Sequence, residues 1–263
     1  MSSGTELVPA ADPKVPATVP EYLVFQLAAA EVQSIIDENL SGETLGLNDL
    51  DKVKVPSGGG TVWEVPSLEG TTATKELDGI IVHRQRCRAY YANPYTGEGV
   101  PPDCFSDDGV VGICPNPDLG LGGPCEDCPM SKYESEVRQD GKKGRGQACK
   151  EQLNVFLLRK DSMLPLVLNL PPTSLKPMKD FMKRLTSAGM LAHHVETRFT
   201  LSKEKNDDGV AYSLVSATMI RRLEGGEVTA ISGLVAAIKP ILTRVRTSRP
   251  QATAPAQEEQ PQG

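Results

Sequence analysis

Two cysteines separated by two residues, Cys125 and Cys128, lie in the stretch GGPCEDCP. Thiols at this spacing are typical of half a metal site, of a redox pair or of a disulfide anchor. A redox pair of the thioredoxin type belongs to a βαβ unit, and the residues around Cys125 do not alternate strand with helix. The neighbouring Gly and Pro residues favour a tight turn, on which both thiols can face one point.

Metal binding is favoured over a disulfide because the sequence predicts a cytoplasmic protein. The first residues lack a basic segment, and Gln26 and Glu31 interrupt the longest early apolar run, so we expect neither a signal peptide nor a membrane span. Disulfides rarely persist in the cytosol. With 263 residues, the chain is also long enough to bury a core without a disulfide or a metal.

The other thiols extend the metal hypothesis. Five of the six cysteines lie between 104 and 149, in a segment rich in Gly, Pro and Asp that has almost no apolar periodicity. A structural zinc ion takes four tetrahedral ligands, commonly a C-x2-C knuckle and a second pair from elsewhere in the chain. Cys149, just before an apolar run, is the natural third ligand, and spacing leaves the fourth open between Cys104 and Cys114. The alternative is that these thiols are small buried apolar residues.

A catalytic role for the metal is disfavoured, as are other enzyme classes. Catalytic zinc usually takes histidine ligands, and His83, His193 and His194 all lie outside the cysteine-rich segment. The stretch GKKGRGQACK is glycine-rich and basic, but it lacks the order of a phosphate loop. A nucleophile elbow of the G-x-S-x-G type is also missing from the sequence. We therefore expect a binding protein and not an enzyme.

The remaining residues predict a mainly β protein of the α+β class. Extended apolar runs at 75–91, 154–160 and 164–170 and a hairpin over the turn NDDG predict strands, and a helix with its N-cap at Thr173 or Ser174 and its stop at Gly189 lies between them. This order suits a small β-barrel with a long zinc-bearing excursion. We expect a flexible arm (1–20), an N-terminal helical segment (21–50), the first part of the barrel (51–103), a zinc-binding, loop-rich insertion (104–149), the second part of the barrel (150–225) with helix 174–188, a C-terminal helix (226–248) and a disordered tail (249–263).

Charge is unevenly distributed along the chain. Residues 1–78 hold 13 acidic and 4 basic residues, whereas residues 79–202 hold 14 acidic and 16 basic residues. On the strand predicted at 75–91, alternation places Arg84, Arg86, Arg88 and Tyr90 on one face. Cations interleaved with an aromatic ring are typical of a surface that binds single-stranded nucleic acid. The alternative is an edge strand that its charges keep soluble.

Residues 60–220 resemble a known family. The runs PPDCFSDDGVVG, GGPCEDCP, GQACK before an apolar strand, and LPLVLNLPPTSLKPMKDFMKRL are similar to the zinc-containing single-stranded-DNA-binding proteins of phages and prophages. The plan also resembles that of the T4-like helix-destabilising proteins, in which a zinc subdomain interrupts an OB-fold. The chain departs from the T4-like pattern in having no histidine among the expected ligands. Its tail after 250 holds only Glu258 and Glu259 as acidic residues, so the resemblance does not extend to an acidic tail that recruits partners.

The resemblance implies an OB-like barrel, a structural Zn²⁺ and sequence-independent binding of single-stranded DNA in replication or recombination, with proteins of those processes as further partners and no membrane. It implies four zinc ligands, Cys104, Cys125, Cys128 and Cys149, with Cys114 left over. The expected nucleic-acid contacts are Arg84, Arg86, Arg88, Tyr90, Tyr91, Trp63, Lys150 and Arg159. For Trp63, the only tryptophan, the alternative is a core anchor, and Tyr91 is expected on the face opposite the arginines. The alternative function is a zinc-stabilised protein-interaction module, such as a phage or mobile-element accessory, that does not bind nucleic acid. A duplex reader is disfavoured because no helix-turn-helix or zinc-finger spacing is evident.

Overall fold

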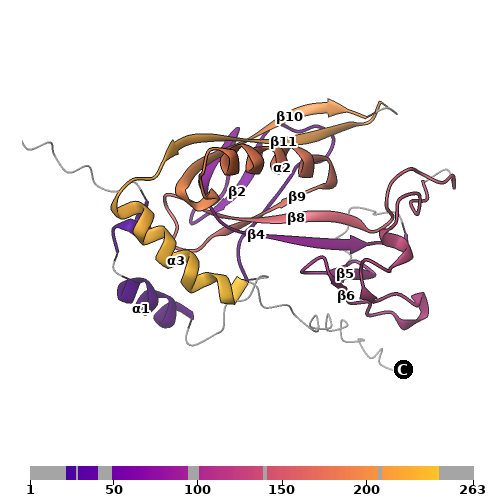
Figure 1. The fold of residues 1–263 in the computed structure, drawn as a ribbon, viewed down its shortest axis with the longest axis horizontal. Helices are drawn as coiled ribbons and strands as arrows, with labels where there is room; N and C mark the ends of the chain where they lie inside the picture. The colour runs from indigo at the N-terminus through magenta and orange to yellow at the C-terminus, as the bar shows by residue number, and fades with distance from the viewer. Residues whose placement is uncertain are drawn as a thin grey trace, which may run out of the picture.

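The structure is a computed structural model that describes residues 22–27, 29–40, 49–93, 101–138, 141–206 and 209–242. It is a mixed α+β protein, mainly β, in which one sheet curls through half of a barrel (Figure 1). The predicted arm (1–20) and tail (249–263) lie outside the described residues.

Seven strands form the main sheet. Six of them lie in the order β1 (Lys52–Lys54), β9 (Leu166–Leu170), β8 (Lys150–Leu158), β4 (Glu76–Tyr90), β10 (Val195–Lys205) and β11 (Ala211–Arg222), and β5 (Cys104–Ser106) pairs with the end of β4. β1 runs parallel to β9, and the other pairs are antiparallel. Two small ribbons complete the strands: β2 (Trp63–Ser67) with β3 (Gly70–Thr74), and β6 (Val111–Gly112) with β7 (Gly123–Pro124). The predicted strands and the hairpin over NDDG are thus confirmed.

The helices lie around this sheet. They are α1 (Ala29–Leu40), α2 (Pro172–Ser187) and α3 (Gly226–Leu242), with 3-10 turns η1 (Leu23–Phe25), η2 (Pro117–Leu119), η3 (Pro129–Ser131) and η4 (Ala192–His194). In the described part of the predicted N-terminal segment, η1 precedes α1, and the fully buried Tyr22 packs in the cluster on the α3 side of the sheet. Positions 21, 28 and 41–48 of that segment lie outside the described residues. Helix α3 starts where it was expected, and residues 243–248 are outside the described part. No described helix is both long and apolar enough to cross a membrane.

Helix α2 is confirmed, but its predicted N-cap is wrong. The N-cap is Pro171, and Thr173 and Ser174 lie inside the first turn. The Ser174 hydroxyl accepts a hydrogen bond from the Val215 amide at 3.0 Å, so this side chain joins the helix to β11 instead of capping it. Gly189 follows the helix with a φ of 68°, a left-handed conformation that favours glycine and ends the helix as predicted.

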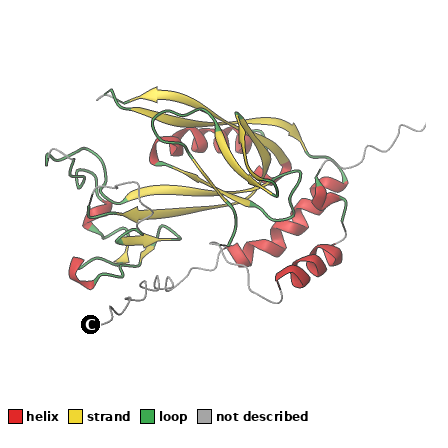
Figure 2. Cartoon of the chain, turned by 180° about the vertical axis from the view of Figure 1, so that it is seen from behind, coloured by secondary structure: helices red, strands yellow, loops and turns green. Residues whose placement is uncertain are grey.

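Two hydrophobic clusters lie on opposite faces of the sheet. Successive side chains of a strand point to opposite faces, so Val155 and Leu157 of β8 join one cluster and Phe156 and Leu158 join the other. The first cluster lies under α2 and the β2–β3 ribbon, and the second lies under α3 and η1, as Figure 2 shows from behind. Residues 104–149 contribute to neither cluster.

The paired ends of β4 and β8 project beyond this core. Residues 84–89 of β4 pair with residues 150–155 of β8 in a segment that we call the β4–β8 arm. Residues 153–155 also pair with β9, so only residues 87–89 and 150–152 extend past that strand. The arm ends at residues 104–149, the cysteine lobe, which lies to the right of the core in Figure 1. The arm therefore joins the two parts of the chain for which function was predicted.

Candidate metal centre and nucleic-acid face

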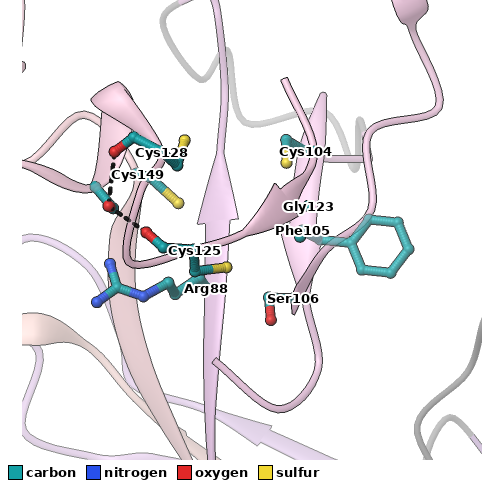
Figure 3. Close-up of a pocket in the computed structure, with 11 residues that line it drawn as sticks. Arg88, Cys104, Phe105, Ser106, Gly123, Cys125, Cys128 and Cys149 are labelled. Atoms are coloured by element: carbon teal, nitrogen blue, oxygen red, sulfur yellow. Dashed lines mark hydrogen bonds between the residues drawn. The ribbon is translucent and has the colours of Figure 1, made fainter. Parts of the chain in front are cut away.

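Four cysteines of the lobe line one pocket: Cys104, Cys125, Cys128 and Cys149. They come from β5, from the turn between β7 and η3, and from the residue before β8. In Figure 3 their sulfur atoms are turned toward a common space. The cavity volume is about 10 Å³, which is room for about one water molecule and too little for an organic ligand.

Backbone hydrogen bonds fix the two halves of this pocket. The Cys125 amide donates to the Val110 carbonyl at 2.7 Å, and the Cys149 amide donates to the Met130 carbonyl at 2.8 Å. The Ser131 hydroxyl lies within hydrogen-bond distance of the carbonyls of both knuckle cysteines, at 2.8 Å from that of Cys128. The knuckle is thereby tied to the strand that precedes it and to the approach to β8.

Gly112 allows the backbone of β6 to pass close to two of the sulfurs. A Cβ atom at this position would lie 3.4 Å from the Sγ of Cys104 and 3.6 Å from the Sγ of Cys125. These are ordinary van der Waals distances, so the backbone of β6 packs directly beside both thiols.

Cys114 lies outside this arrangement. It does not line the pocket, and its thiol donates hydrogen bonds to the Asp103 carbonyl at 3.3 Å and the Asn116 carbonyl at 3.1 Å. The pocket thus groups the four cysteines that the resemblance implied as ligands and omits the fifth.

The lobe has almost no aliphatic core of its own. Its buried residues are Cys104, Phe105, Ser106, Cys125, Ser131, Gly144 and Cys149. Among the described residues of the lobe, Phe105 is the only large apolar side chain that is buried. Most of the other buried side chains are thiols. A metal ion bound by the thiols would take the place of a hydrophobic core.

Burial raises the pKa of three of these thiols, Cys104, Cys125 and Cys149. It raises the pKa of Cys104 to about 12 and that of Cys149 to about 11. Across the described part of the chain, no three His, Cys, Asp or Glu side chains are arranged so that they could hold a metal ion as they stand. Metal binding would have to release the protons and bring the sulfurs closer together.

Arg88 belongs to the cysteine pocket and not to an open surface. It lines the pocket, its side chain is only 15% exposed, and its Nη2 atom lies 3.3 Å from Oε2 of Glu151. Its Nη1 atom is buried and has no hydrogen-bond partner among the described residues. The expected contact between Arg88 and nucleic acid is therefore corrected, because this guanidinium group is directed into the lobe.

The alternation predicted along β4 is confirmed by its pairing with β8. Arg84 lies opposite Val155 and Arg86 opposite Leu153, both of which contact the cluster under α2. Arg84 is exposed at the surface and has no ion-pair partner within the described residues, but the surrounding protein partly desolvates its guanidinium group and lowers its pKa. The Arg86 side chain is 69% exposed, with Nη1 3.3 Å from Oε1 of Glu151. These two arginines thus share one accessible face of the arm.

The two tyrosines at the end of β4 remain partly accessible. Tyr90 is half-buried beside β5, where burial and Asp103 raise the pKa of its phenol. Tyr91 follows the strand and is 37% exposed. By strand alternation Tyr90 lies on the side of β4 that also carries Arg84 and Arg86, and the pocket thiols Cys128 and Cys149 add to the rise in the pKa of its phenol.

Trp63 is not accessible for stacking on a base. Its side chain is 0% exposed, and its Nε1 donates a hydrogen bond to the Phe199 carbonyl at 3.3 Å. It forms part of the cluster under α2. The expected nucleic-acid contact at Trp63 is wrong, because the large ring fills the space between the β2–β3 ribbon and the sheet.

The two cations predicted near the zinc lobe differ in position. Lys150 is close to the lobe and pairs with Glu136. Arg159 follows the opposite end of β8, nine residues and roughly 30 Å away at about 3.3 Å per residue. There its guanidinium donates to Asp161 at 2.8 Å and to the Pro66 carbonyl at 3.2 Å. Arg159 is therefore not a contact of the lobe region.

The sequence interpretation missed a second basic surface. Residues 132–146, which we call the finger, carry the exposed Tyr133 together with the exposed cations Lys132, Arg138, Lys142, Lys143 and Arg145. The signal in the sequence was the Asp-Gly pair at 140–141 between short alternating runs, which is typical of a hairpin.

Comparisons with known proteins identify no relative of this chain. No protein-family model matches it, no curated protein matches it, and no solved structure matches it. Its function must therefore be argued from the geometry of the lobe and the arm.

Proposed function

We propose that this protein binds single-stranded nucleic acid, DNA foremost, without reading its sequence, and that a structural Zn²⁺ ion holds the cysteine lobe in the shape that this binding requires. The observation that carries the proposal is the location of exposed Arg84 and Arg86 on one face of an arm that ends in a pocket of four thiols. Cations of this kind neutralise phosphates, and rings beside them stack on unpaired bases.

The residues of the lobe fit zinc in three respects. Four thiols are the number of ligands that a structural Zn²⁺ ion takes, and at position 112 no side chain competes for the space beside two of them. Four thiolates around Zn²⁺ carry two net negative charges, which the buried guanidinium of Arg88 would partly offset. Cys104, Cys125, Cys128 and Cys149 would hold the ion, which would supply folding energy and no chemistry of its own.

The arm would bind the strand as follows. Arg84 and Arg86 lie two residues apart on β4, so their guanidinium groups are spaced along one edge of the bound backbone. Glu151 lies between Arg86 and Arg88 and holds both at a fixed position, at the cost of one negative charge on this face. Tyr90 follows at the lobe end of the same face and would stack on a base.

An OB-like fold is part of this proposal. The curled sheet, the helix α2 between β9 and β10, and the cysteine lobe between β4 and β8 are in the order expected for an OB-like barrel interrupted by a zinc subdomain. Folds of this class bind oligonucleotides on their sheet surface. The two arginines lie on the side of the sheet that α2 covers, at the end of β4 that leads to the cysteine lobe.

The proposal is tested by titrating a fluorescent oligo-dT with zinc-loaded protein at two salt concentrations, with a duplex of equal length as the control. We expect tight binding to the single strand that weakens steeply as salt is raised, and weak binding to the duplex. The Arg84→Ala/Arg86→Ala variant should bind more weakly and with a shallower salt dependence, by a slope of about 0.7 per phosphate contact removed. Fully metallated protein that leaves the oligonucleotide unbound would refute the proposal.

A second candidate, a protein-interaction module, is favoured by a different observation. Met219 and Ile220 are 43% and 42% exposed on the edge strand β11. Met219, but not Ile220, lines a pocket with a cavity volume of about 240 Å³ together with Phe181, Leu185, Met190 and Arg184 among others. An apolar interface of this kind should respond little to salt, so the same titration series with a candidate protein partner separates the two functions.

A further inference from the structure

The finger presents one aromatic ring and several cations at the outer end of the cysteine lobe. Tyr133 is 78% exposed. Lys143 and Arg145 are also exposed, and neither forms an ion pair with another described residue. Glu136, one of the acidic residues here, forms an ion pair with Lys150, and the hydrogen bond from that lysine lowers the pKa of the Glu136 carboxyl group. Glu134, next to the ring, is exposed as well, and its amide donates to the Arg145 carbonyl at 3.4 Å. Among its described residues the finger therefore carries five cations and two carboxylates, beside an exposed ring.

Backbone hydrogen bonds hold the finger as a narrow hairpin. The Gly144 amide donates to the Glu136 carbonyl at 2.8 Å, and the Arg138 amide donates to the Lys142 carbonyl at 2.9 Å. An isolated bridge joins Val137 to Lys143. The two sides of the finger are thus fixed relative to each other on either side of positions 139–140, which lie outside the described residues.

The base of the finger is tied to the proposed zinc ligands. The Ser135 hydroxyl donates to the Met130 carbonyl at 3.0 Å and accepts from the Ala148 amide at 2.9 Å. The Gln147 side chain donates to the Ser131 carbonyl at 2.6 Å. These bonds join the segment after Cys128 to the segment before Cys149, so the position of the finger follows that of the two cysteines.

We propose that the finger is a second contact for the single strand, in which Tyr133 stacks on a base while Lys143 and Arg145 neutralise the flanking phosphates. This inference rests on the proposed function and adds to it. The arm supplies the first contact, and the metal site positions the second at its end. The cysteine lobe would then hold the finger in a position from which it can contact the nucleic acid.

The test uses full-length, zinc-loaded protein and the oligo-dT titration. Tyr133→Ala should bind about tenfold more weakly or worse, whereas Tyr133→Phe, which retains the ring, should bind like the parent. Lys143→Ala/Arg145→Ala should reduce the slope of log affinity against log salt by about 1.4, since each lost contact to a single strand contributes about 0.7. Lys176→Ala/Lys179→Ala is the matched control, because it removes the same charge from the exposed side of α2 and should leave both quantities nearly unchanged.

The outcomes separate this inference from the proposed function. If the parent binds the single strand and both finger variants bind equally well, the finger is not a contact and the arm alone carries binding. If the α2 control weakens binding as much as the finger variants, the effect is one of total charge and the inference is wrong. If the parent itself does not bind, both proposals fail. Zinc content should equal that of the parent in every variant, because the substituted side chains are exposed and none is a thiol.

Discussion

Arg88 and Glu151 face each other across β4 and β8, with Nη2 and Oε2 3.3 Å apart. This pair directs a cation toward the cysteine pocket, although its place in the sequence between Arg86 and Tyr90 suggested a surface role. The exposed Arg86 contacts the other oxygen of the same carboxylate. Glu151 thus forms ion pairs both with Arg88 in the pocket and with the exposed Arg86.

Arg88→Met should weaken zinc binding about tenfold or more, as is typical when a residue that supports metal ligands is lost. The reason is that the cation beside the thiolates disappears while the ligands stay in place. The measurement is the rate and extent of zinc transfer to a colorimetric chelator. Arg86→Met, which shares the partner Glu151, is the control and should retain zinc while binding oligo-dT more weakly. Equal zinc retention in both variants would refute this role of Arg88.

Tyr90→Ala should bind oligo-dT about tenfold more weakly, because stacking on one base contributes about 1–3 kcal/mol. The ring is half-buried beside β5, so the variant needs a control for folding. Tyr90→Phe retains the ring and should bind like the parent. A folded Tyr90→Ala protein of parental affinity would show that this ring does not contact bases.

The intrinsic fluorescence of this protein should report unfolding and not binding. Trp63 is the only tryptophan in the chain and is fully buried. Its emission should be blue-shifted, shielded from acrylamide and unchanged when oligo-dT is added. Trp63→Ala should lower the free energy of unfolding by about 3–5 kcal/mol, as for other large core residues. Strong quenching by the oligonucleotide would place the ring at the interface after all.

Acid should weaken the attachment of α3 to the sheet. Arg221 donates two hydrogen bonds to Glu227, at 2.8 and 2.9 Å, and thereby lowers the pKa of that carboxyl group. A carboxyl group whose pKa is lower in the folded state stabilises the fold above its unfolded pKa, and this contribution disappears as pH falls through the folded pKa. Glu227→Gln should therefore be less stable than the parent at pH 7, by about 1–3 kcal/mol in urea unfolding, and the difference should shrink at strongly acidic pH. A difference that is independent of pH would contradict this account.

Substitution of two glycines by alanine should change the stability of the protein in opposite directions. A Cβ atom at Gly79 would lie 2.6 Å from Cγ of Leu157 and 2.6 Å from the Leu158 carbonyl oxygen, in the centre of the sheet. Gly79→Ala should therefore cost about 1–3 kcal/mol through overpacking. Gly233 lies on α3, where an added Cβ atom would have no neighbour within 4 Å, so Gly233→Ala should stabilise the protein by about 0.5–1 kcal/mol. Thermal unfolding of the two variants measures both effects.

The sequence was sufficient for the elements whose hydrophobic period is regular. The hairpin from Val195 and the helix α2 follow directly from alternation and from a 3.6-residue stripe, and the alternation predicted along β4 holds from His83 to Tyr90, after a bulge between Ile81 and His83. The direction of long side chains was less predictable. Arg88 was assigned to the same surface as Arg86 from their shared face, but its guanidinium turns toward thiols that only the tertiary fold brings to that end of the arm.

The predictions for Trp63 and Arg159 were wrong because the position of each side chain depends on the tertiary fold. A lone tryptophan in a strand is equally suited to a core and to a surface, and only the packing of the β2–β3 ribbon against the sheet decides between them. Arg159 was placed near the lobe because it follows Cys149 closely in sequence, but an extended strand carries it to the far end of the sheet. The finger was missed because its exposed residues follow no apolar period.

The separation of the cysteine lobe from both hydrophobic clusters has a consequence for cooperativity. Since residues 104–149 add nothing to either cluster, the sheet with α2 and α3 can stay folded while the lobe opens. Amide hydrogens of the lobe should therefore exchange with solvent through a local opening event whose free energy is set by the metal. Those of β8 between Val155 and Leu158 should exchange only when the whole molecule unfolds. If the lobe binds zinc as proposed, the concentration of free zinc would change the stability of the lobe and leave that of the sheet unchanged.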